Sequence, residues 1–545
     1  MSIEADRPRA GGARRASRSV RLSSRERRAL RRDTTHTAGR RALRPGDQAP
    51  ARPADLPRGG RRVNRRRRRT HGLPGTVGMT FLGAVIPGSG YLYAGRKLIG
   101  GVVLAGWLAI VVALLVRFGT DWHRALDLVF DPTALRVVAA VVAVLLLIWV
   151  GVVWTSYRMV RPRRRTRAQT VLGNVAVVVI CLVVAAPVLR AAQYAMATAG
   201  LVTKVFDNNT TATTPHLNAK DPWADKARVN VLLLGGDGDI GREGVRTDSM
   251  ILLSIDTHTG KTTTFSLPRN LANAQFPPDS PLRKLYPNGF GDGDPADGNY
   301  MLNAVYRDVP MYHPGVLGKS HNEGADAIKE AISGTLGLPV DYYLLVNLSG
   351  FREIVNAIGG VTVNVNEPIA IQGDTSDHIP PIGYIAPGAN QHLDGYHALW
   401  FARGRWGADD YQRMDRQRCM IKAIIDAADP ATLLTRYLDV VKAGQKIVLT
   451  DIPKEMGPAF VELALRMKDA KVRSVVFKAS AQFSSADPDF DYIHQTVQAA
   501  LDPAKHPHHT SSNPPENPTD VCGYHPTGRT VADALAYDAQ FQSDH

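Results

Sequence analysis

Residues 229–256 read VNVLLLGGDGDIGREGVRTDSMILLSID, two apolar β-rich runs on either side of a glycine-rich loop. The runs Val229–Gly235 and Ser249–Asp256 have the length and the Val, Leu and Ile content of buried strands. Because the loop joins them directly, Asp237 and Asp248 fall at neighbouring ends of two adjacent strands. Carboxylate oxygens placed there suit one divalent cation, although Asp and Gly also gather in ordinary surface loops. The loop lacks the GxxxxGK[ST] pattern of a nucleotide-binding loop.

Outward from this stretch, strands and helices alternate along the chain. Further strands are expected at Thr262–Leu267, Tyr342–Asn347, Val361–Val365 and Val472–Phe477. Helices are expected at Ala325–Leu336, Gly350–Ile358, Tyr411–Ala428 and Ala459–Lys468. Such alternation predicts a layered α/β domain.

Charged residues follow these elements at two places. Arg269 comes directly after a strand and a proline in FSLPRN, and Arg403 and Arg405 stand in ALWFARGRWGADD. Two residues apart, Arg403 and Arg405 would point to one side of an extended segment. Asp409 and Asp410 precede the helix expected from residue 411, where carboxylates interact favourably with a helix N-terminus.

That helix carries further polar residues on one face. Arg413, Arg416 and Gln417 are three or four residues apart, which places them together on the helix surface. A single arginine is usually a solvated surface charge. Five arginines within residues 403–418, among Trp, Tyr and Met, instead favour phosphate binding, because a guanidinium group binds phosphate oxygens in a bidentate manner.

Three apolar segments precede this region, and each is long enough to cross a membrane. Segments 98–116, 137–155 and 170–189 contain no Asp, Glu, Lys or Arg, and about 20 such residues span a hydrocarbon core. We therefore expect a transmembrane helical anchor within residues 76–190. The stretch 76–94 is also apolar, but Pro87, Gly88 and Gly90 interrupt it, so we expect a short interfacial or re-entrant hairpin there.

The positive charge of the chain is concentrated near its beginning. Residues 1–70 hold 23 Arg and no Lys against six Asp and Glu, and the remainder is nearly neutral. Residues 1–75 are expected to be a disordered tail that contacts membrane lipids or a partner, and no specific nucleic acid is expected. The loop 156–169 is also rich in arginine. The positive-inside rule therefore places the tail and this loop in the cytoplasm, and everything after Arg190 outside.

Outside the membrane we expect a stalk at 191–226, a soluble domain at 227–502 and a loose C-terminal tail at 503–545. Cys419 and Cys522 are the two cysteines after the third apolar segment. An oxidising exterior permits a disulfide bond between them, and two unpaired thiols are the alternative.

In this order, the motifs resemble the LytR–CpsA–Psr family. The resemblance extends over about residues 229–477 and rests on the strand-Asp stretch, RTD, SLPRN, LYPNGF with LNAVY, DYYLLVNLSGFREIVNAIGGVTVNV, HLDGYHALWFARGR and DDYQRMDRQR. The three-span anchor and the arginine-rich tail are similar to those of actinobacterial members. The resemblance implies an α/β fold of the layered α-β-α type with a central mixed sheet, behind a transmembrane anchor.

The resemblance also implies an activity. Such proteins are phosphotransferases at the outer face of the cytoplasmic membrane that move a glycopolymer from a polyprenyl (pyro)phosphate carrier to peptidoglycan through a phosphodiester bond. By position, Asp237 and Asp248 would hold Mg²⁺ (or Mn²⁺), and Asp410 is the candidate base for the acceptor hydroxyl. The residues expected to bind phosphate oxygens are Arg246, Arg269, Arg403, Arg405 and Arg413. Gln417 and Arg416 are expected to bind substrate, with a structural role as the alternative for Arg416.

Two features depart from the family pattern. Many members have a lysine before the segment equivalent to LNAVY, where this chain has Met301, and Lys284 is the candidate replacement for substrate binding. The stretch 289–299 is rich in Gly and Asp, which would change the rim of the donor site.

A polyprenyl carrier needs an apolar groove. The expected walls are helix 351–358 and strands 342–346 and 361–365, with ordinary core packing as the alternative. Hydrolysis of the same lipid carrier, membrane-bound regulation of transcription and glycopolymer binding without catalysis remain alternative functions. The sequence contains neither a GxSxG elbow nor an HExxH motif, so a covalent enzyme intermediate is not expected.

Overall fold

The computed structural model describes residues 70, 72–119, 123–206, 210–215, 218, 221–224, 226–236, 247–291, 300–374, 378–428, 432, 435–468, 470–506 and 510–544. The predicted site residues Asp237 and Arg246 lie outside the described residues. So do the arginine-rich tail 1–69 and residues 292–299 of the Gly- and Asp-rich stretch.

A mixed sheet lies at the centre of the described domain. Its strands, in the spatial order β10-β3-β2-β1-β4-β9, are β1 (Arg228–Gly236), β2 (Thr247–Asp256), β3 (Thr262–Leu267), β4 (Tyr342–Asn347), β9 (Val448–Thr450) and β10 (Val472–Val476). The pairs β1–β2, β2–β3 and β4–β9 are antiparallel, whereas β1–β4 and β3–β10 are parallel. The structure therefore confirms the mixed sheet.

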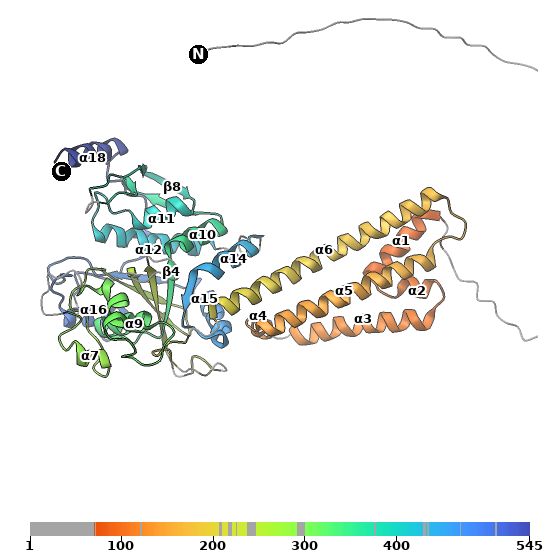
Figure 1. The fold of residues 1–545 in the computed structure, drawn as a ribbon, viewed down its shortest axis with the longest axis horizontal. Helices are drawn as coiled ribbons and strands as arrows, with labels where there is room; N and C mark the ends of the chain where they lie inside the picture. Colours follow the sequence, from red (N-terminus) through yellow and green to blue (C-terminus); the bar gives the residue numbers. More distant parts are fainter. Residues whose placement is uncertain are drawn as a thin grey trace, which may run out of the picture. The chain divides into compact units, whose positions relative to one another are not determined.

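Helices cover both faces of this sheet, because successive side chains of a strand point to opposite sides. Leu232 and Leu234 of β1 belong to the main core, which includes residues of α8 (Val305–Tyr312), α9 (Glu323–Leu336) and α16 (Phe490–Leu501). Val229 and Val231 pack with Leu463 of α15 (Gly457–Lys468). Figure 1 shows α9 and α16 on one side of β4 and α15 on the other. The layered α-β-α arrangement is thus confirmed.

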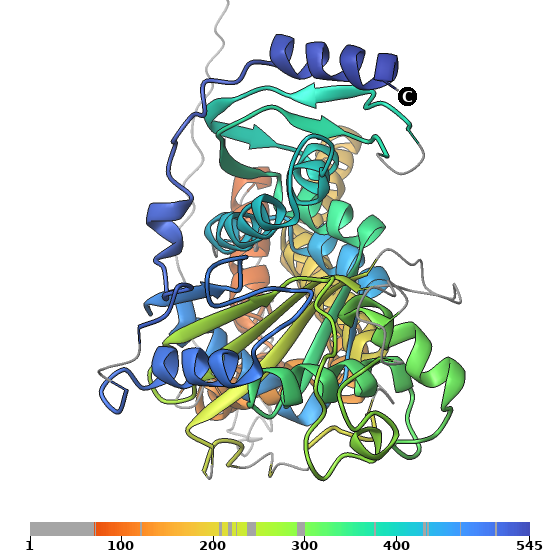
Figure 2. The ribbon, with the colours of Figure 1, turned by 90° about the vertical axis from the view of Figure 1, so that its left-hand side faces the viewer.

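A second, smaller core follows β4. Asn347 caps the N-terminus of α10 (Leu348–Ile358), since its side-chain oxygen accepts a hydrogen bond from Gly350 N at 2.8 Å. The elements that follow are β5 (Val361–Val365), β6 (Ile369–Ile371), β7 (Gly383–Ile385), β8 (Gly388–Leu393), α11 (Gly395–Arg403) and α12 (Asp410–Ala427). Val355, Val361, Phe401 and Met420 share this core. In Figure 2 its short strands lie above the central sheet.

Three of the N-terminal helices are long and apolar enough to cross a membrane: α3 (Lys97–Phe118), α5 (Pro132–Val160) and α6 (Arg167–Phe206). They contain the three predicted spans. The stretch 76–94 forms α1 (Gly72–Val85) and α2 (Ser89–Tyr93). The break falls at Gly88, whose φ of 100° is a conformation that L-residues rarely adopt. With 14 residues, α1 is about 21 Å long and shorter than a hydrocarbon core.

The chain between the third span and the sheet differs from the expected stalk. Helix α6 continues through residues 191–206, where Gln445 Nε2 donates to Ala197 O at 3.1 Å from α14 (Tyr437–Ile447). Thr198 Oγ1 also bonds the hydroxyl of Tyr437. The first part of the stalk is therefore helical, because its buried side chains pack against the domain.

The loop after α6 is also docked onto the domain. Lys329 and Asp451 form a buried ion pair at 2.6 Å, and Asp451 Oδ2 also accepts from Thr214 Oγ1 at 3.1 Å. Asp326 Oδ1 accepts from Thr213 N at 2.9 Å. Since both carboxylates bind the loop, residues 210–215 belong to the folded domain.

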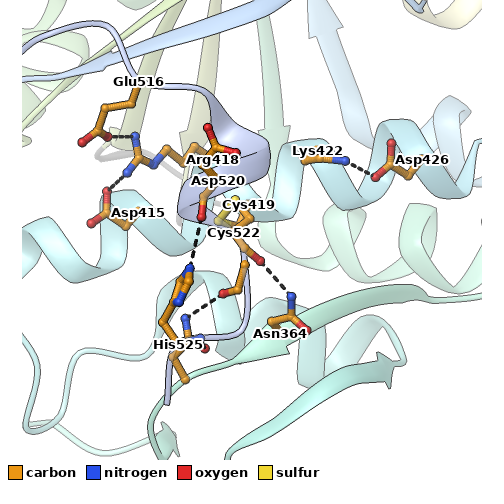
Figure 3. The surroundings of a disulfide bond; sticks show 12 residues. Asn364, Asp415, Arg418, Cys419, Lys422, Asp426, Glu516, Asp520, Cys522 and His525 are labelled. Carbon is orange, nitrogen blue, oxygen red and sulfur yellow. Dashed lines mark hydrogen bonds and ion pairs between the residues drawn. A yellow bond between two sulfur atoms is a disulfide. The ribbon is translucent and has the colours of Figure 1, made fainter. Parts of the chain in front are cut away.

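The expectation of a loose C-terminal tail is wrong for the described residues. Cys419 of α12 and Cys522 form a disulfide bond, with a Cα–Cα distance of 5.5 Å. Glu516 pairs with Ser474 through two backbone hydrogen bonds of 2.7 and 2.9 Å and receives a hydrogen bond from Arg418, which also pairs with Asp415 (Figure 3). The polar composition of the tail suggested disorder, but a few specific contacts hold it in place. They position α17 (Pro518–Val521) and α18 (Val531–Asp544).

Candidate active site

The strand register brings two predicted site residues together. Antiparallel pairing places Met250 of β2 opposite Leu267, the last residue of β3. Arg269, two residues past β3, therefore lies beside Asp248, the second residue of β2. Arg269 Nη1 donates to Asp248 Oδ1 at 2.7 Å. The RTD and SLPRN motifs thus meet in one ion pair.

The N-terminus of α12 adds a second carboxylate. Asp409 is the N-cap: its side chain accepts from Gln412 N at 2.7 Å, and Gln412 Oε1 accepts from Asp409 N at 3.0 Å. This capping box fixes the first turn, in which Asp410 and Arg413 are stacked. Arg413 Nη2 lies 3.2 Å from Asp410 Oδ2 and 3.4 Å from the carbonyl oxygen of Asp248.

Arg269 connects Asp248 with Asp410, and Arg405 approaches Asp410 as well. Arg269 Nε lies 3.6 Å from Asp410 Oδ2, and Arg405 Nη1 lies 4.0 Å from Asp410 Oδ1. Asp248, Arg269, Arg405, Asp410 and Arg413 therefore form one group, which we call the ion-pair cluster. Its three arginines exceed its two carboxylates, so the described group has a net positive charge and favours an anionic ligand.

Burial and charge act in opposite directions within the ion-pair cluster. Burial alone would raise the pKa of Asp248, but the charges of Arg269, Arg413 and Arg405 outweigh it and hold that pKa below its usual range. Burial lowers the pKa of Arg413 to about 10, against the attraction of Asp410. Burial, followed by repulsion from Arg269, lowers the pKa of Arg405. Asp248 and Arg413 therefore remain charged at neutral pH.

One arginine of the cluster has a buried donor without a partner among the described residues. Arg413 Nε is buried and has no hydrogen-bond partner among the described residues. An unpaired buried donor is unfavourable, and a phosphate oxygen would satisfy it.

Arg403 lies apart from Arg405. Arg403 is the last residue of α11, with its guanidinium carbon 5.6 Å from the centre of the Trp400 ring, whereas Arg405 follows in the next loop. The expectation of one extended segment is wrong, because α11 continues to Arg403. The two side chains line different cavities.

Arg416 does not join the ion-pair cluster. Its Nε donates to Phe401 O at 2.8 Å, its Nη2 bonds Gly404 O, and its Nη1 lies 3.7 Å from Glu367 Oε1. Phe401 lies in the last turn of α11, where carbonyl groups lack helical partners. Arg416 satisfies them, so the structural alternative describes it better than substrate binding.

Lys284 is exposed on α7 (Pro281–Leu285) and, among the described residues, takes no part in the ion-pair cluster. Met301, which stands where many members have lysine, forms a backbone bridge with Ala272. The structure thus gives Lys284 no contact that would make it a replacement.

An apolar cavity of about 320 Å³ adjoins the ion-pair cluster between β1, β2, β4, α10 and α12. Asp248, Arg403, Arg413 and Gln417 are among its polar lining residues. Its larger apolar lining residues are Leu233, Leu234, Ile251, Leu344, Val346, Leu348, Phe351, Ile354, Leu399, Met420, Ile421, Ile424 and Ile425. The predicted walls 342–346 and 351–358 are confirmed. Strand 361–365 contributes no lining residue in the described part of the chain, since its side chains belong to the second core.

A polar cavity of about 700 Å³ adjoins the cluster from another direction. Its lining residues are Arg269, Gly373, Asp374, Arg405, Trp406, Gly407, Ala408, Asp409, Gln412 and Tyr537. Asp248 and Arg413 line the apolar cavity, whereas Arg269 and Arg405 line the polar one. The ion-pair cluster therefore separates an apolar space from a polar one.

The donor set at the cluster fits a metal ion that is shared with a phosphate ligand. No group of three His, Cys, Asp or Glu side chains suited to a metal occurs within the described residues. Mg²⁺ in phosphate sites is bound by one or two carboxylates, with substrate oxygens and waters completing its shell. Asp248 supplies one such carboxylate beside Arg269 and Arg413, whose guanidinium groups are suited to phosphate.

The sequence missed two parts of this region. The α12 wall of the apolar cavity was signalled by Met420, Ile421, Ile424 and Ile425, but their spacing also fits ordinary core packing. The contribution of Tyr537 had no signal, because it depends on where the C-terminal segment folds back.

Residues 194–502, more than half of the chain, match the LytR_cpsA_psr family. Two curated relatives are each named polyisoprenyl-teichoic acid–peptidoglycan teichoic acid transferase TagU. The protein of Bacillus cereus is 31% identical over 229 residues, which cover 42% of this chain and 61% of the relative. That of Enterococcus faecalis is 30% identical over 241 residues, which cover 44% and 64%. The chain thus matches less than two thirds of the length of these relatives.

Solved structures are similar as well. Bacillus subtilis TagV aligns with a TM-score of 0.36 at 23% identity, covering 51% of this chain and 98% of TagV. TagT bound to LIIa-WTA aligns with a TM-score of 0.34 at 19% identity, covering 54% of this chain and 95% of TagT.

Proposed function

Since the chain belongs to the LytR–CpsA–Psr family, we propose that it transfers a glycopolymer from a polyprenyl (pyro)phosphate carrier to peptidoglycan through a phosphodiester bond. The proposal extends to this chain what the names of its TagU relatives state for teichoic acid. The observation that carries it is the junction of the apolar cavity with the ion-pair cluster. A lipid carrier has an isoprenoid chain, which suits the apolar cavity, and a (pyro)phosphate head group, which suits the ion-pair cluster beside it.

Phosphoryl transfer requires positioning and charge neutralisation more than covalent participation by the protein. Arg269, Arg405 and Arg413 would bind phosphate oxygens, and the unpaired Nε of Arg413 is a donor already present for this purpose. The isoprenoid chain would occupy the apolar cavity, with Arg403 and Gln417 at its polar lining.

In the reaction, a hydroxyl oxygen of the acceptor forms a bond to the phosphorus that carries the glycopolymer. The bond from this phosphorus to the oxygen of the lipid phosphate breaks, and polyprenyl phosphate leaves with the electron pair. Asp410 would accept the proton of the attacking hydroxyl. Its two oxygens lie 3.2 to 4.0 Å from the arginines of the cluster, which keeps the carboxylate beside the bound phosphate.

Asp248 would hold Mg²⁺, together with Asp237 from outside the described residues. The ion would neutralise negative charge on the (pyro)phosphate. Arg269 would keep Asp248 ionised for this role, since the arginine charges lower the pKa of the carboxyl group.

We propose that the catalytic domain lies at the outer face of the cytoplasmic membrane. Three helices are long and apolar enough to cross it, and the arginine-rich segments before α3 and between α5 and α6 favour the cytoplasm. With three spans, the residues after α6 would emerge on the opposite side, where a lipid-linked glycopolymer and peptidoglycan meet.

The test uses the full chain in detergent with a polyprenyl-pyrophosphate-linked oligosaccharide, peptidoglycan fragments and Mg²⁺. Mass spectrometry should detect a phosphodiester-linked conjugate. Arg269→Ala or Asp248→Ala should lower the rate by roughly 10²- to 10³-fold, the range for loss of a charge-stabilising group. Lys422→Ala is the matched control, because Lys422 pairs with Asp426 on the same helix outside the cluster.

Two results would contradict the proposal. Phospho-oligosaccharide released without a conjugate would indicate hydrolysis of the carrier. Carrier binding without turnover in the presence of Mg²⁺ or Mn²⁺ would indicate a binding protein. Chelation of the metal should abolish conjugate formation if the proposed role of Asp248 is right.

A further inference from the structure

The C-terminal helix α18 packs on the loop that carries Arg405. Asp538 Oδ1 accepts hydrogen bonds from Trp406 Nε1 at 2.7 Å and from the hydroxyl of Tyr384 at 2.6 Å. The rings of Trp406 and Phe541 meet edge to face, with centroids 4.9 Å apart. Because Trp406 is buried and directly follows Arg405, these contacts hold the loop from which Arg405 reaches the ion-pair cluster.

The same helix directs Tyr537 to the polar cavity. Tyr537 lines this cavity together with Arg269 and Arg405, although it follows Arg405 by about 130 residues and Arg269 by about 270 residues in the chain. It lies beyond residues 194–502, the part that matches the family. In Figure 2, α18 lies across the short strands of the second core. A segment outside the family region therefore supplies a lining residue, Tyr537, of a cavity that reaches the cluster.

One cavity is apolar and the other is polar, which matches the apolar leaving group and the polar acceptor of the proposed phosphoryl transfer. In such a reaction the attacking and leaving oxygens stand roughly in line on opposite sides of phosphorus. The lipid phosphate is the leaving group, and its chain requires the apolar cavity. The attacking hydroxyl must then approach from the other side of the ion-pair cluster, where Arg269 and Arg405 line the polar cavity.

We propose that the polar cavity binds the sugar ring of the acceptor glycan that carries the attacking hydroxyl, and that α18 completes this subsite with Tyr537. The inference rests on the proposed function, since it assigns the acceptor side of that reaction. The hydroxyl proton passes to Asp410, the P–O bond forms from the cavity side, and the bond to the lipid phosphate breaks on the other side.

The lining fits a sugar in its chemistry and size. Asp409, Gln412 and Arg405 provide hydrogen-bonding groups, and Tyr537 provides an aromatic face for the C–H groups of a ring. About 700 Å³ lies within the range of small-ligand pockets. Gly407, with φ of 70°, and Gly373, with φ of 87°, keep side chains out of two turns in the wall.

The test compares Tyr537→Ala with Leu535→Ala in the full chain. Leu535 is 55% exposed on the same helix and is the matched control. Tyr537→Ala should raise the KM for a peptidoglycan fragment roughly three- to tenfold, the effect of losing one aromatic contact. The KM for the lipid-linked donor should stay unchanged, and Tyr537→Phe should restore the acceptor KM because it retains the ring. Equal unfolding temperatures of the variants would exclude loss of the helix as the cause.

A direct titration separates this inference from the proposed function. The same peptidoglycan fragment, without donor, is titrated calorimetrically into the wild type, Tyr537→Ala and Leu535→Ala. Weaker binding by Tyr537→Ala alone supports the subsite even if no variant shows transfer. Unchanged binding of the fragment, or a rise in the donor KM instead of the acceptor KM, would overturn the assignment. The second result would place the glycan of the donor in the cavity.

Discussion

Arg269 contacts both carboxylates of the ion-pair cluster. Its Nη1 binds Asp248, and its Nε lies near Asp410. Its planar guanidinium group presents several donors in a fixed geometry to both partners, whereas the ammonium group of lysine is a compact point charge. In the proposed reaction the residue would therefore serve in two ways, as a phosphate ligand and as the link between Asp248 and Asp410.

Replacement of Arg269 by lysine tests this double role. We expect Arg269→Lys to retain part of the activity, with a loss of about tenfold against roughly 10²- to 10³-fold for Arg269→Ala. The lysine keeps the charge but lacks the planar fork of donors that holds both carboxylates in a fixed geometry. Initial rates of conjugate formation give the comparison. Equal losses in the two variants would show that charge alone has no value at this position.

The pKa of Asp248 makes a prediction for stability. This pKa is lowered in the folded chain, so the ionised carboxylate stabilises the fold above its ordinary pKa near 4. The contribution is lost as the pH falls through the lowered value. The difference in unfolding temperature between the wild type and Asp248→Asn should therefore be largest near neutral pH and should shrink below about pH 4.

Thermal unfolding in detergent between about pH 3 and pH 7 measures this difference. Asp426→Asn is a suitable control, because Asp426 is 61% exposed and pairs only at the surface with Lys422. A difference for Asp248→Asn that stays constant over the whole range would mean that the arginines do not stabilise its charge.

At the scale of single residues, the sequence predicted which residue types form the site better than it predicted where their side chains point. Asp248, Arg269 and Arg413 were expected at the site, and the structure brings them together. Arg416 was expected there because it is three residues from Arg413. Its side chain instead donates to a carbonyl group at the end of α11. The spacing of residues along α12 does not predict this contact, because the contact depends on how α11 packs against α12.

Among the elements, β1 and β2 were predictable because both are apolar runs that end in glycine or aspartate. Helix α12 was predictable as a helix, but the sequence pattern did not show that its two halves line different parts of the site. Its first turns carry Asp410 and Arg413, and its second half lines the apolar cavity. Which face of a helix lines a cavity depends on its tertiary packing against β1 and α10.

The second half of α12 offers a test of lipid binding. Ile425 lines the apolar cavity and is 47% exposed, so a charged side chain is tolerated by the fold at this position. We expect Ile425→Asp to raise the KM for a long-chain polyprenyl donor by about tenfold, since a charge there opposes burial of isoprenoid methylene groups.

Donors of different chain length check the cause. Ile425→Asp should affect a short-chain donor less than a long-chain donor, while the KM for the acceptor stays constant. Lys422→Asp, on the same helix but outside the cavity, is the control for added negative charge. A loss that is independent of chain length would contradict a lipid site at Ile425.

In the whole molecule, the disulfide bond closes a loop between residues 103 apart in the chain. Cross-links of this span contribute up to about 5 kcal/mol in the chain-entropy account. Cys522→Ser, combined with Cys419→Ser, should therefore lower the unfolding temperature and expose residues 503–545 to proteases. Limited proteolysis and thermal unfolding are the measurements.

A reducing agent should act on the wild type as these substitutions do and leave the double variant unchanged. Cys181→Ser, within α6, should resemble the wild type in both conditions. Protease resistance of the tail in the double variant would show that the Arg418–Glu516 pair and the Glu516–Ser474 bridge suffice to hold it.

At this scale the sequence was least informative. Length, apolar segments and arginine distribution predicted an anchor and a separate domain. The composition of the tail suggested disorder, yet its position depends on a few partners scattered over α12, β10 and the second core. Such contacts are specific pairs rather than patterns, so composition does not reveal them.

The unbroken course of α6 has a mechanical consequence. The helix is 40 residues, or about 60 Å, long, and residues beyond its apolar span hydrogen-bond to α14 of the catalytic domain. Because the end of α6 is bound to the domain, the length of this helix would set the distance of the domain from the bilayer. Under the proposed function, this arrangement would confine transfer to newly made glycan strands close to the membrane, and older strands in the outer layers of the wall would lie beyond its reach.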